Sequence, residues 1–251
     1  MQKSLVKKAK IRFTSPMTDE EKQNLFSQID ALQKILEETK PFDCEAGYDI
    51  EKIKACVTQM ADFVIAEETE AASLINWMNS TDFWKSPAST RFHGNFECGL
   101  AAHSLKVLQQ ALLLAKPLME NYWTCPNKDK YTITAEDIFV SAITHDFCKA
   151  DTYKIEYRNT KDILGNWVKK PIYKTRDENR NLGHGNESVL KLLALMPSYI
   201  KKRHVLEAIS RHMGFSDLSD SESYNYSNFI DNPLVVLIQL ADSTAAQWFN
   251  L

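Results

Sequence analysis

Apolar residues recur along most of the chain at the three- and four-residue spacing that is typical of amphipathic helices. Short polar or proline-containing segments interrupt this pattern, so the helices should be separate elements joined by loops. The predicted helices cover residues from about 18 to 36, 50–77 with a break near 67–71, 98–116, 135–149, 184–196, 199–213 and 231–249.

Local signals predict where several of these helices begin and end. Thr18 and Glu21 have the spacing of a capping box, and Thr134 caps a later helix. Pro117 is expected to end the helix that precedes it, because proline lacks an amide hydrogen and clashes with the preceding turn. Pro233 follows a capping residue and occupies the first position of the last helix.

Two segments alternate with the two-residue period of a strand instead. Residues 5–13 indicate a short strand or an extended arm. In residues 152–182, tyrosine and isoleucine alternate with charged residues, turn-forming residues follow at 159–165, and residues 167–175 form a returning strand. This second segment is therefore predicted to be a β-hairpin inserted between helices.

These elements predict an all-α helical bundle that carries one small β-hairpin insertion. Residues 1–89 would form an N-terminal arm and helices packed on the bundle, and residues 90–251 would form the bundle itself. A chain of 251 residues is long enough for one domain of this size.

Composition limits the class of protein. The hydrophobic content of 44%, the charged content of 25% and the net charge of −3 are ordinary for a globular protein, and they give no overall basic footprint for nucleic acid. The five cysteines are dispersed without a CxxC pair, which indicates reduced thiols. No apolar run is long enough to cross a membrane, so we expect a soluble, cytoplasmic protein without a membrane partner.

Six histidine and aspartate residues carry the most informative signal. Five of the six stand where a helical pattern calls for an apolar residue, or at the start of such a helix, and burying them unpaired would cost several kcal/mol. One shared metal centre would satisfy all of them, and its ligands would come from separate helices of the bundle. The six candidate metal ligands are His103, His145, Asp146, His184, His212 and Asp242.

Other residues are candidates for contacts with a substrate. Lys149 lies one helical turn beyond His145, where its ammonium group would reach a phosphoryl oxygen beside the metals. Arg211 is either a phosphate ligand or a partner in an ordinary salt bridge. Trp167 and Tyr173 stand among lysines in the predicted hairpin, a mixture that suits a flap over a nucleotide and equally suits a solvated ribbon.

Five short motifs in this order resemble those of the HD-domain metal-dependent phosphohydrolases. They are GLAAHSLKV, ITHDFCK, GHGNES, ISRHMG and LADS, and they cover about residues 90–249. The amino-acid sequences of these motifs are most similar to those in the HD domains of bacterial 3′-to-5′ exoribonucleases. The chain departs from the family pattern at Cys148, which stands where the family has glycine before the lysine.

The resemblance implies an HD-domain helical bundle and a ligand set. His103, His145, Asp146 and Asp242 would hold a first ion, while His184 and His212 would hold a second ion that Asp146 bridges. Lys149 matches the family lysine that contacts the substrate phosphate. The resemblance thus implies a hydrolase that uses one or two divalent transition-metal ions, such as iron or manganese, to cleave a phosphoester. The substrate would be a phosphorylated small molecule, a nucleotide or a short nucleic acid.

Two other functions are compatible with the same residues. Di-iron oxygenases that cleave C–H or C–P bonds with O₂ also use a six-ligand HD site. A non-catalytic module would bind a nucleotide or a structural metal. His93 precedes the helix of His103, where it would either contact the substrate or, as we expect, have a structural or exposed position, and His204 is expected on the surface after a basic run.

Overall fold

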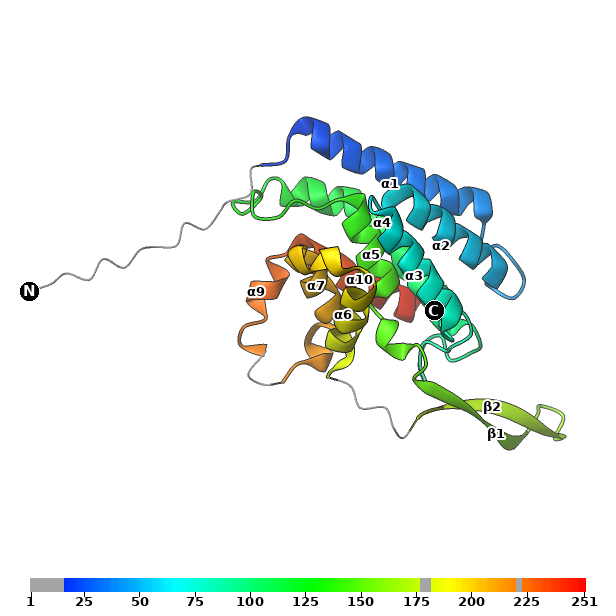
Figure 1. The fold of residues 1–251 in the computed structure, drawn as a ribbon. Helices are drawn as coiled ribbons and strands as arrows, with labels where there is room; N and C mark the ends of the chain where they lie inside the picture. The colour runs from blue at the N-terminus through cyan, green and yellow to red at the C-terminus, as the bar shows by residue number, and fades with distance from the viewer. Residues whose placement is uncertain (1–15, 177–181, 220–222) are drawn as a thin grey trace, which may run out of the picture.

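The computed structural model describes residues 16–176, 182–219 and 223–251. The strand or arm expected at 5–13 lies outside these ranges. Within them the fold is mostly helical, with one two-stranded antiparallel sheet, as the periodicity predicts (Figure 1). In the same ranges no helix combines the length and the apolar character needed to cross a membrane.

Three N-terminal helices cover one side of the bundle: α1 (Asp19–Thr39), α2 (Ile50–Val64) and α3 (Glu68–Ser80). The capping box at the start of α1 is confirmed, because the Thr18 hydroxyl accepts from the Glu21 amide and the Glu21 carboxylate accepts from the Thr18 amide. Helices α1 and α2 pack on each other and on the central helices, and all share one hydrophobic core. The expected break between α2 and α3 is also present.

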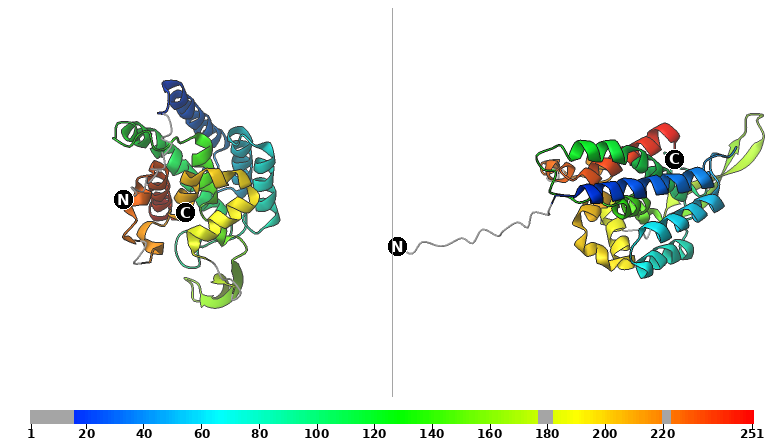
Figure 2. Two further views of the ribbon diagram at one scale, coloured as in Figure 1. Left: turned by 60° about the vertical axis from the view of Figure 1, so that its left-hand side comes forward. Right: turned by 90° about the horizontal axis from the view of Figure 1, so that it is seen from above.

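The centre of the bundle is α4 (Gly99–Tyr122), which contacts α1, α2, α5 (Ala135–Thr144) and α10 (Pro233–Phe249) (Figures 1 and 2). The prediction that Pro117 ends this helix is wrong, since α4 continues for more than a turn beyond it. The carbonyl group that loses its amide partner belongs to Leu113, which is exposed, so water can satisfy it. Burial of Met119 beyond the proline offsets the lost hydrogen bond.

The C-terminal half supplies shorter elements before α10: α6 (His184–Leu195), the 3₁₀ turn η2 (Pro197–Lys201), α7 (Arg203–Ser210), the 3₁₀ turn η3 (Gly214–Asp217) and α9 (Ser227–Ile230). The helix predicted over 199–213 is wrong in its bounds, because the backbone leaves the helical region at Lys202 and again at Arg211. Leaving the helix at Lys202 lets its ammonium group contact Glu136 and Asp137 on α5.

A close approach of α6 to α7 sets the spacing of two candidate ligands. A Cβ atom at Gly185 would lie 2.3 Å from the backbone oxygen of Ser210, so only glycine fits between these helices. His184 is next to Gly185 in sequence, and His212 follows Ser210 by two residues. The glycine contact therefore brings both histidines to the same end of the helix pair.

The predicted hairpin is confirmed as β1 (Tyr153–Lys161) paired with β2 (Trp167–Thr175). Figure 1 shows it projecting from the bundle beyond η1 (Phe147–Lys149). Its base is fastened to the loop after α3, where Asp82 and Asp151 each accept a hydrogen bond from the other's amide. The far end is exposed, with Trp167 71% accessible.

A buried carboxylate joins α5 to the segment before α7. Asp137 is 1% exposed, accepts the Thr134 amide in a capping box, and contacts Lys202 at 3.0 Å and His204 at 3.1 Å. His204 is therefore held against Asp137, and its expected surface position is wrong. Burial alone would raise the pKa of Asp137, but the hydrogen bond and charge of His204, together with Lys202 and Thr134, lower it to about 2.

Replacing Asp137 with asparagine should lower the free energy of unfolding by about 2 kcal/mol at pH 7. A carboxyl group whose pKa is depressed in the folded state stabilises the fold above its unfolded pKa of about 4, and this contribution disappears as the pH falls toward 2. Denaturant unfolding between pH 3 and pH 7 should therefore show a gap between wild type and variant that narrows in acid. Asp62→Asn, at an exposed position on α2, is the matched control. A gap that is constant with pH would contradict this account.

Candidate metal centre

Five separate segments bring the six predicted ligands to one place. His103 comes from the first half of α4, His145 and Asp146 from the end of α5, and Asp242 from α10. His184 is the first residue of α6, and His212 lies in the turn after α7. The prediction that all six converge inside the bundle therefore agrees with the structure.

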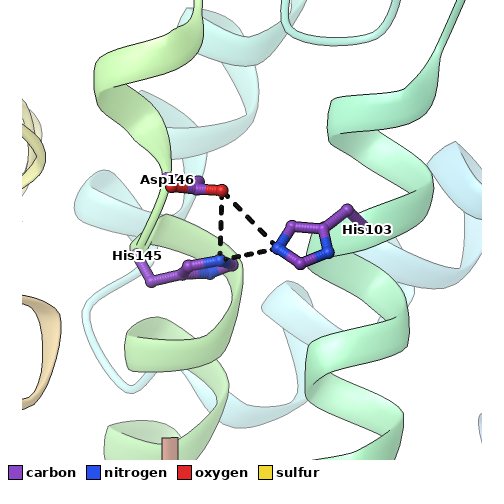
Figure 3. A group of neighbouring side chains, drawn as sticks. All are labelled: His103, His145 and Asp146. Atoms are coloured by element: carbon purple, nitrogen blue, oxygen red, sulfur yellow. Dashed lines mark hydrogen bonds and ion pairs between the residues drawn. The ribbon is translucent and has the colours of Figure 1, made fainter. Parts of the chain in front are cut away.

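The backbone at the end of α5 allows two neighbouring residues to face one site. Successive residues of an α-helix point about 100° apart, so an unbroken helix would separate their side chains. The helix predicted over 135–149 instead ends at Thr144, and the backbone at Asp146 leaves the helical region before the 3₁₀ turn η1. His145 and Asp146 can then both face His103 across the space between the helices (Figure 3).

The first group of ligand atoms surrounds one oxygen of Asp146. The Nε2 atoms of His103 and His145 lie 3.1 Å apart, and they are 3.5 Å and 3.4 Å from Asp146 Oδ2 (Figure 3). Asp242 Oδ1 closes the group at 3.2 Å from His103 Nε2 and 4.0 Å from His145 Nε2. His103 and His145 are fully buried, so their Nε2 atoms cannot form hydrogen bonds with bulk water.

The second group surrounds the other oxygen of the same carboxylate. Asp146 Oδ1 is 2.6 Å from His184 Nε2 and 3.5 Å from His212 Nε2. Asp146 is 1% exposed and His212 is 2% exposed, while His184 is more accessible. Asp146 is therefore the one residue that both groups share.

Backbone carbonyl groups fix the orientation of two imidazoles. His145 Nδ1 lies 2.7 Å from the oxygen of Ala142, and His212 Nδ1 lies 2.7 Å from the oxygen of Ile209. A carbonyl only accepts, so each Nδ1 carries the hydrogen and the neutral ring presents a lone pair at Nε2. Burial lowers the pKa of His145 despite the nearby carboxylates, which keeps that ring neutral.

The lone pair of His145 faces His103 Nε2 at 3.1 Å and Asp146 Oδ2 at 3.4 Å. That of His212 faces Asp146 Oδ1 at 3.5 Å and has no hydrogen bond among the described residues. Two acceptors about 3.5 Å apart repel each other unless a cation lies between them. Ligand atoms on one ion with bonds of about 2.1 Å are roughly 3.0–3.4 Å apart at octahedral to tetrahedral angles. Most distances in the first group lie close to this range, whereas the 2.6 Å between His184 Nε2 and Asp146 Oδ1 is a hydrogen-bond distance that would have to widen around an ion. The imidazole and carboxylate chemistry of both groups suits divalent transition-metal ions.

Local charges hold the carboxylates and one imidazole ionised. Burial would raise the pKa of Asp146, but Lys149, His145 and His184 hold it well below its usual range. Burial likewise opposes ionisation of Asp242, and the imidazoles of His103, His145 and His212 outweigh it and lower the pKa. Burial alone would lower the pKa of His184, whereas its contact with Asp146 raises it to about 10. An ion at the second group must displace this proton from His184.

Lys149 lies at the edge of the centre. Its Nζ atom is 2.6 Å from Asp146 Oδ2, and the residue is 7% exposed, so a solvated helix end does not describe it. The predicted position beside the metal ligands is therefore correct. Tyr153, at the start of β1, is close enough for its pKa to respond: burial raises it to about 12, against an opposing effect of the Lys149 charge.

His93, for which the sequence favours a structural or exposed position over a substrate contact, lies beside the centre. The ring of His93 lies 4.8 Å from the ring of His103, and its Nε2 atom is buried without a hydrogen bond among the described residues. Burial, and then the charge of His103, lower the pKa of His93 to about 4. His93 precedes α4 in a loop, so no helical periodicity marked it.

The remaining candidates lie outside the cluster. The guanidinium of Arg211 stacks on Phe229 at 4.7 Å and lines a cavity of about 540 Å³ between α6 and α7. Tyr173 is 7% exposed at the base of the hairpin, and Trp167 is near its far end. The hairpin thus starts beside the centre, through Tyr153, but extends away from it (Figure 1).

Comparison with protein-family models, with curated proteins and with solved structures finds no match for this chain. The case for a metal centre therefore rests on the geometry of the six side chains.

Asp146→Ala should remove most of the bound metal, because both groups of ligand atoms depend on this carboxylate. Inductively coupled plasma mass spectrometry of the metal-loaded full chain would measure the ions per protein. His212→Ala should remove at most one ion, and Asp242→Ala the other. Asp43→Ala, an exposed position in the loop after α1, is the control and should keep the full content. Full metal content in Asp146→Ala would show that the shared carboxylate is not a ligand.

Proposed function

We propose that the protein is an HD-type metal-dependent phosphohydrolase that cleaves a phosphoester of a nucleotide or a short nucleic acid. The observation that carries this proposal is the division of the Asp146 carboxylate between two groups of imidazole nitrogens. The motif order gives independent support, since GLAAHSLKV, ITHDFCK, GHGNES, ISRHMG and LADS supply these ligands in the order of that family.

The residues that would hold the ions form two groups, according to which oxygen of Asp146 they lie near. His103, His145, Asp242 and Asp146 Oδ2 would hold one ion, and His184, His212 and Asp146 Oδ1 the other. Iron, manganese or a similar divalent ion suits this mixture of imidazole and carboxylate. Such ions act as Lewis acids that activate water and polarise a phosphoryl group.

Lys149 favours a substrate with a phosphoryl group over a di-iron oxygenase that cleaves a C–H bond. Its ammonium group is buried against Asp146, where burial opposes its charge but Asp146 outweighs that effect and raises its pKa. A permanent cation at this edge would stabilise the charge that develops on the phosphoryl oxygens during hydrolysis. Oxygen-dependent cleavage of a C–H bond develops no such anion, whereas an oxygenase that cleaves a C–P bond would also bind a phosphoryl group and differs from a hydrolase in its need for O₂. The complete ligand set argues against a module that only binds a nucleotide.

The base of the hairpin would contact the part of the substrate beyond the reacting phosphoryl group. A cavity of about 380 Å³ lies between the loop after α3 and β1–β2, and it is lined in part by Lys85, Tyr153, Tyr173 and Arg176. Cations and tyrosines together suit phosphate and base contacts. Tyr173 would form part of this wall, and Trp167, farther along the hairpin, would contact a longer substrate. Arg211 lines a different cavity, so its contact with phosphate would need a substrate that extends past His212.

Lys149→Met should lower kcat for an aryl phosphoester about 100-fold or more while the metal content stays unchanged, because one charged donor to the reacting group is lost. The assay is run anaerobically with manganese, so that turnover itself excludes an oxygenase reaction. Lys52→Met, at an exposed position on α2, is the matched control. Wild-type kcat in Lys149→Met would contradict the proposed role, and turnover that requires oxygen would contradict hydrolysis.

Trp167→Ala should lower turnover of a short single-stranded oligonucleotide and leave a small aryl phosphoester unaffected. Stacking of a base on an aromatic side chain contributes about 1–3 kcal/mol, and Trp167 has the exposure that stacking needs. Trp248→Ala is a matched control, because Trp248 is 75% exposed on α10. Equal effects of Trp167→Ala on both substrates would indicate that the hairpin only supports the fold.

A further inference from the structure

One imidazole of the centre has a different partner from the others. His145 and His212 each direct Nδ1 at a backbone oxygen, at 2.7 Å in both cases. His184 instead directs Nδ1 at the sulfur of Cys148, at 3.5 Å. This pair lies on the far side of the His184 ring from Asp146, so the thiol itself is not aimed at the ions.

Cys148 is held rigidly relative to α6. Its backbone amide donates to the Ser188 hydroxyl at 3.0 Å, and Ser188 is fully buried. Lys191, one turn farther along α6, donates to the carbonyl groups of Phe147 and Ala150. The 3₁₀ turn η1 is thereby fastened to the helix that begins at His184, and Cys148 itself is 6% exposed.

We propose that Cys148 is a positioning residue for His184, whose thiol accepts the Nδ1 hydrogen and orients Nε2 toward the second ion. This inference rests on the proposed two-ion centre. The buried Nε2 atom of His212, which makes no hydrogen bond within the described ranges, independently indicates a ligand at that position. The HD-domain family that the motifs resemble has glycine at the position of Cys148. Glycine offers no side-chain acceptor, so orientation of the histidine by a thiol would be particular to this chain.

The sulfur is needed because the ring of His184 is otherwise weakly held. It is the first residue of α6 and the most exposed of the four histidines in the centre, with a side chain 25% accessible against 0% for His103, His145 and His212. A ring at a helix end with one polar contact can rotate about its χ angles. A second contact at Nδ1 fixes both the tautomer and the plane of the ring.

The test is the stepwise binding of Mn²⁺ to the full chain by isothermal titration calorimetry. Cys148→Ala should weaken the ion of the second group about 10-fold or more, the usual effect of losing a group that orients a metal-bound histidine. The ion of the first group should keep its affinity. Cys148→Ser should restore most of the loss, since a hydroxyl oxygen also accepts, and Cys125→Ala controls for removing a cysteine elsewhere.

Four results would overturn the inference. The first is binding of both ions by Cys148→Ala with wild-type affinity. The second is binding by Cys148→Ser that is no tighter than by Cys148→Ala, which would indicate a packing role. Weakening of both ions together in Cys148→Ala and Cys148→Ser would indicate a general loss of the fold. A wild-type chain that takes up no second ion would overturn the two-ion centre itself, and so differs from a failure of the cysteine alone.

Discussion

The structure depends on one buried carboxylate. Asp146 is 1% exposed, and an isolated ion at such a depth would cost several kcal/mol. Each of its oxygens faces two imidazole nitrogens, and Lys149 adds a third contact to Oδ2. An ion at the second group would replace the repulsion between His212 Nε2 and the carboxylate by coordination, which would explain why this buried nitrogen has no hydrogen bond among the described residues.

The surrounding fold serves to hold these side chains in place. The early end of α5 turns His145 and Asp146 toward the same space, and the contact of Gly185 with Ser210 sets His184 beside His212. Backbone carbonyl groups hold two of the rings, and a thiol holds a third. The ligands come from five segments, so the site forms only when α4, α5, α6, α7 and α10 are packed. Metal binding should accordingly be coupled to folding.

The convergence of the six side chains could be predicted from the sequence because five of them interrupt an apolar pattern or begin a helix, and because their order resembles that of one family. Helix bounds and residue positions that depend on contacts distant in sequence could not be predicted. Pro117 is tolerated because the carbonyl group it leaves unpaired is exposed, and no sequence pattern reports that exposure. The backbone leaves the helix at Lys202 to reach Asp137, which is distant in sequence. The position of His93 beside the centre was not favoured because it lies in a loop, where only the three-dimensional contact with His103 distinguishes it from an exposed histidine.

The most direct test of the central claim is anomalous X-ray diffraction from crystals of the manganese-loaded protein, collected on both sides of the manganese absorption edge. The account predicts two peaks flanking the Asp146 carboxylate, one among His103, His145 and Asp242 and the other between His184 and His212. A single peak on one side would contradict the bridging role of Asp146. Peaks elsewhere, with these six side chains hydrogen-bonded only to one another, would contradict the metal centre altogether.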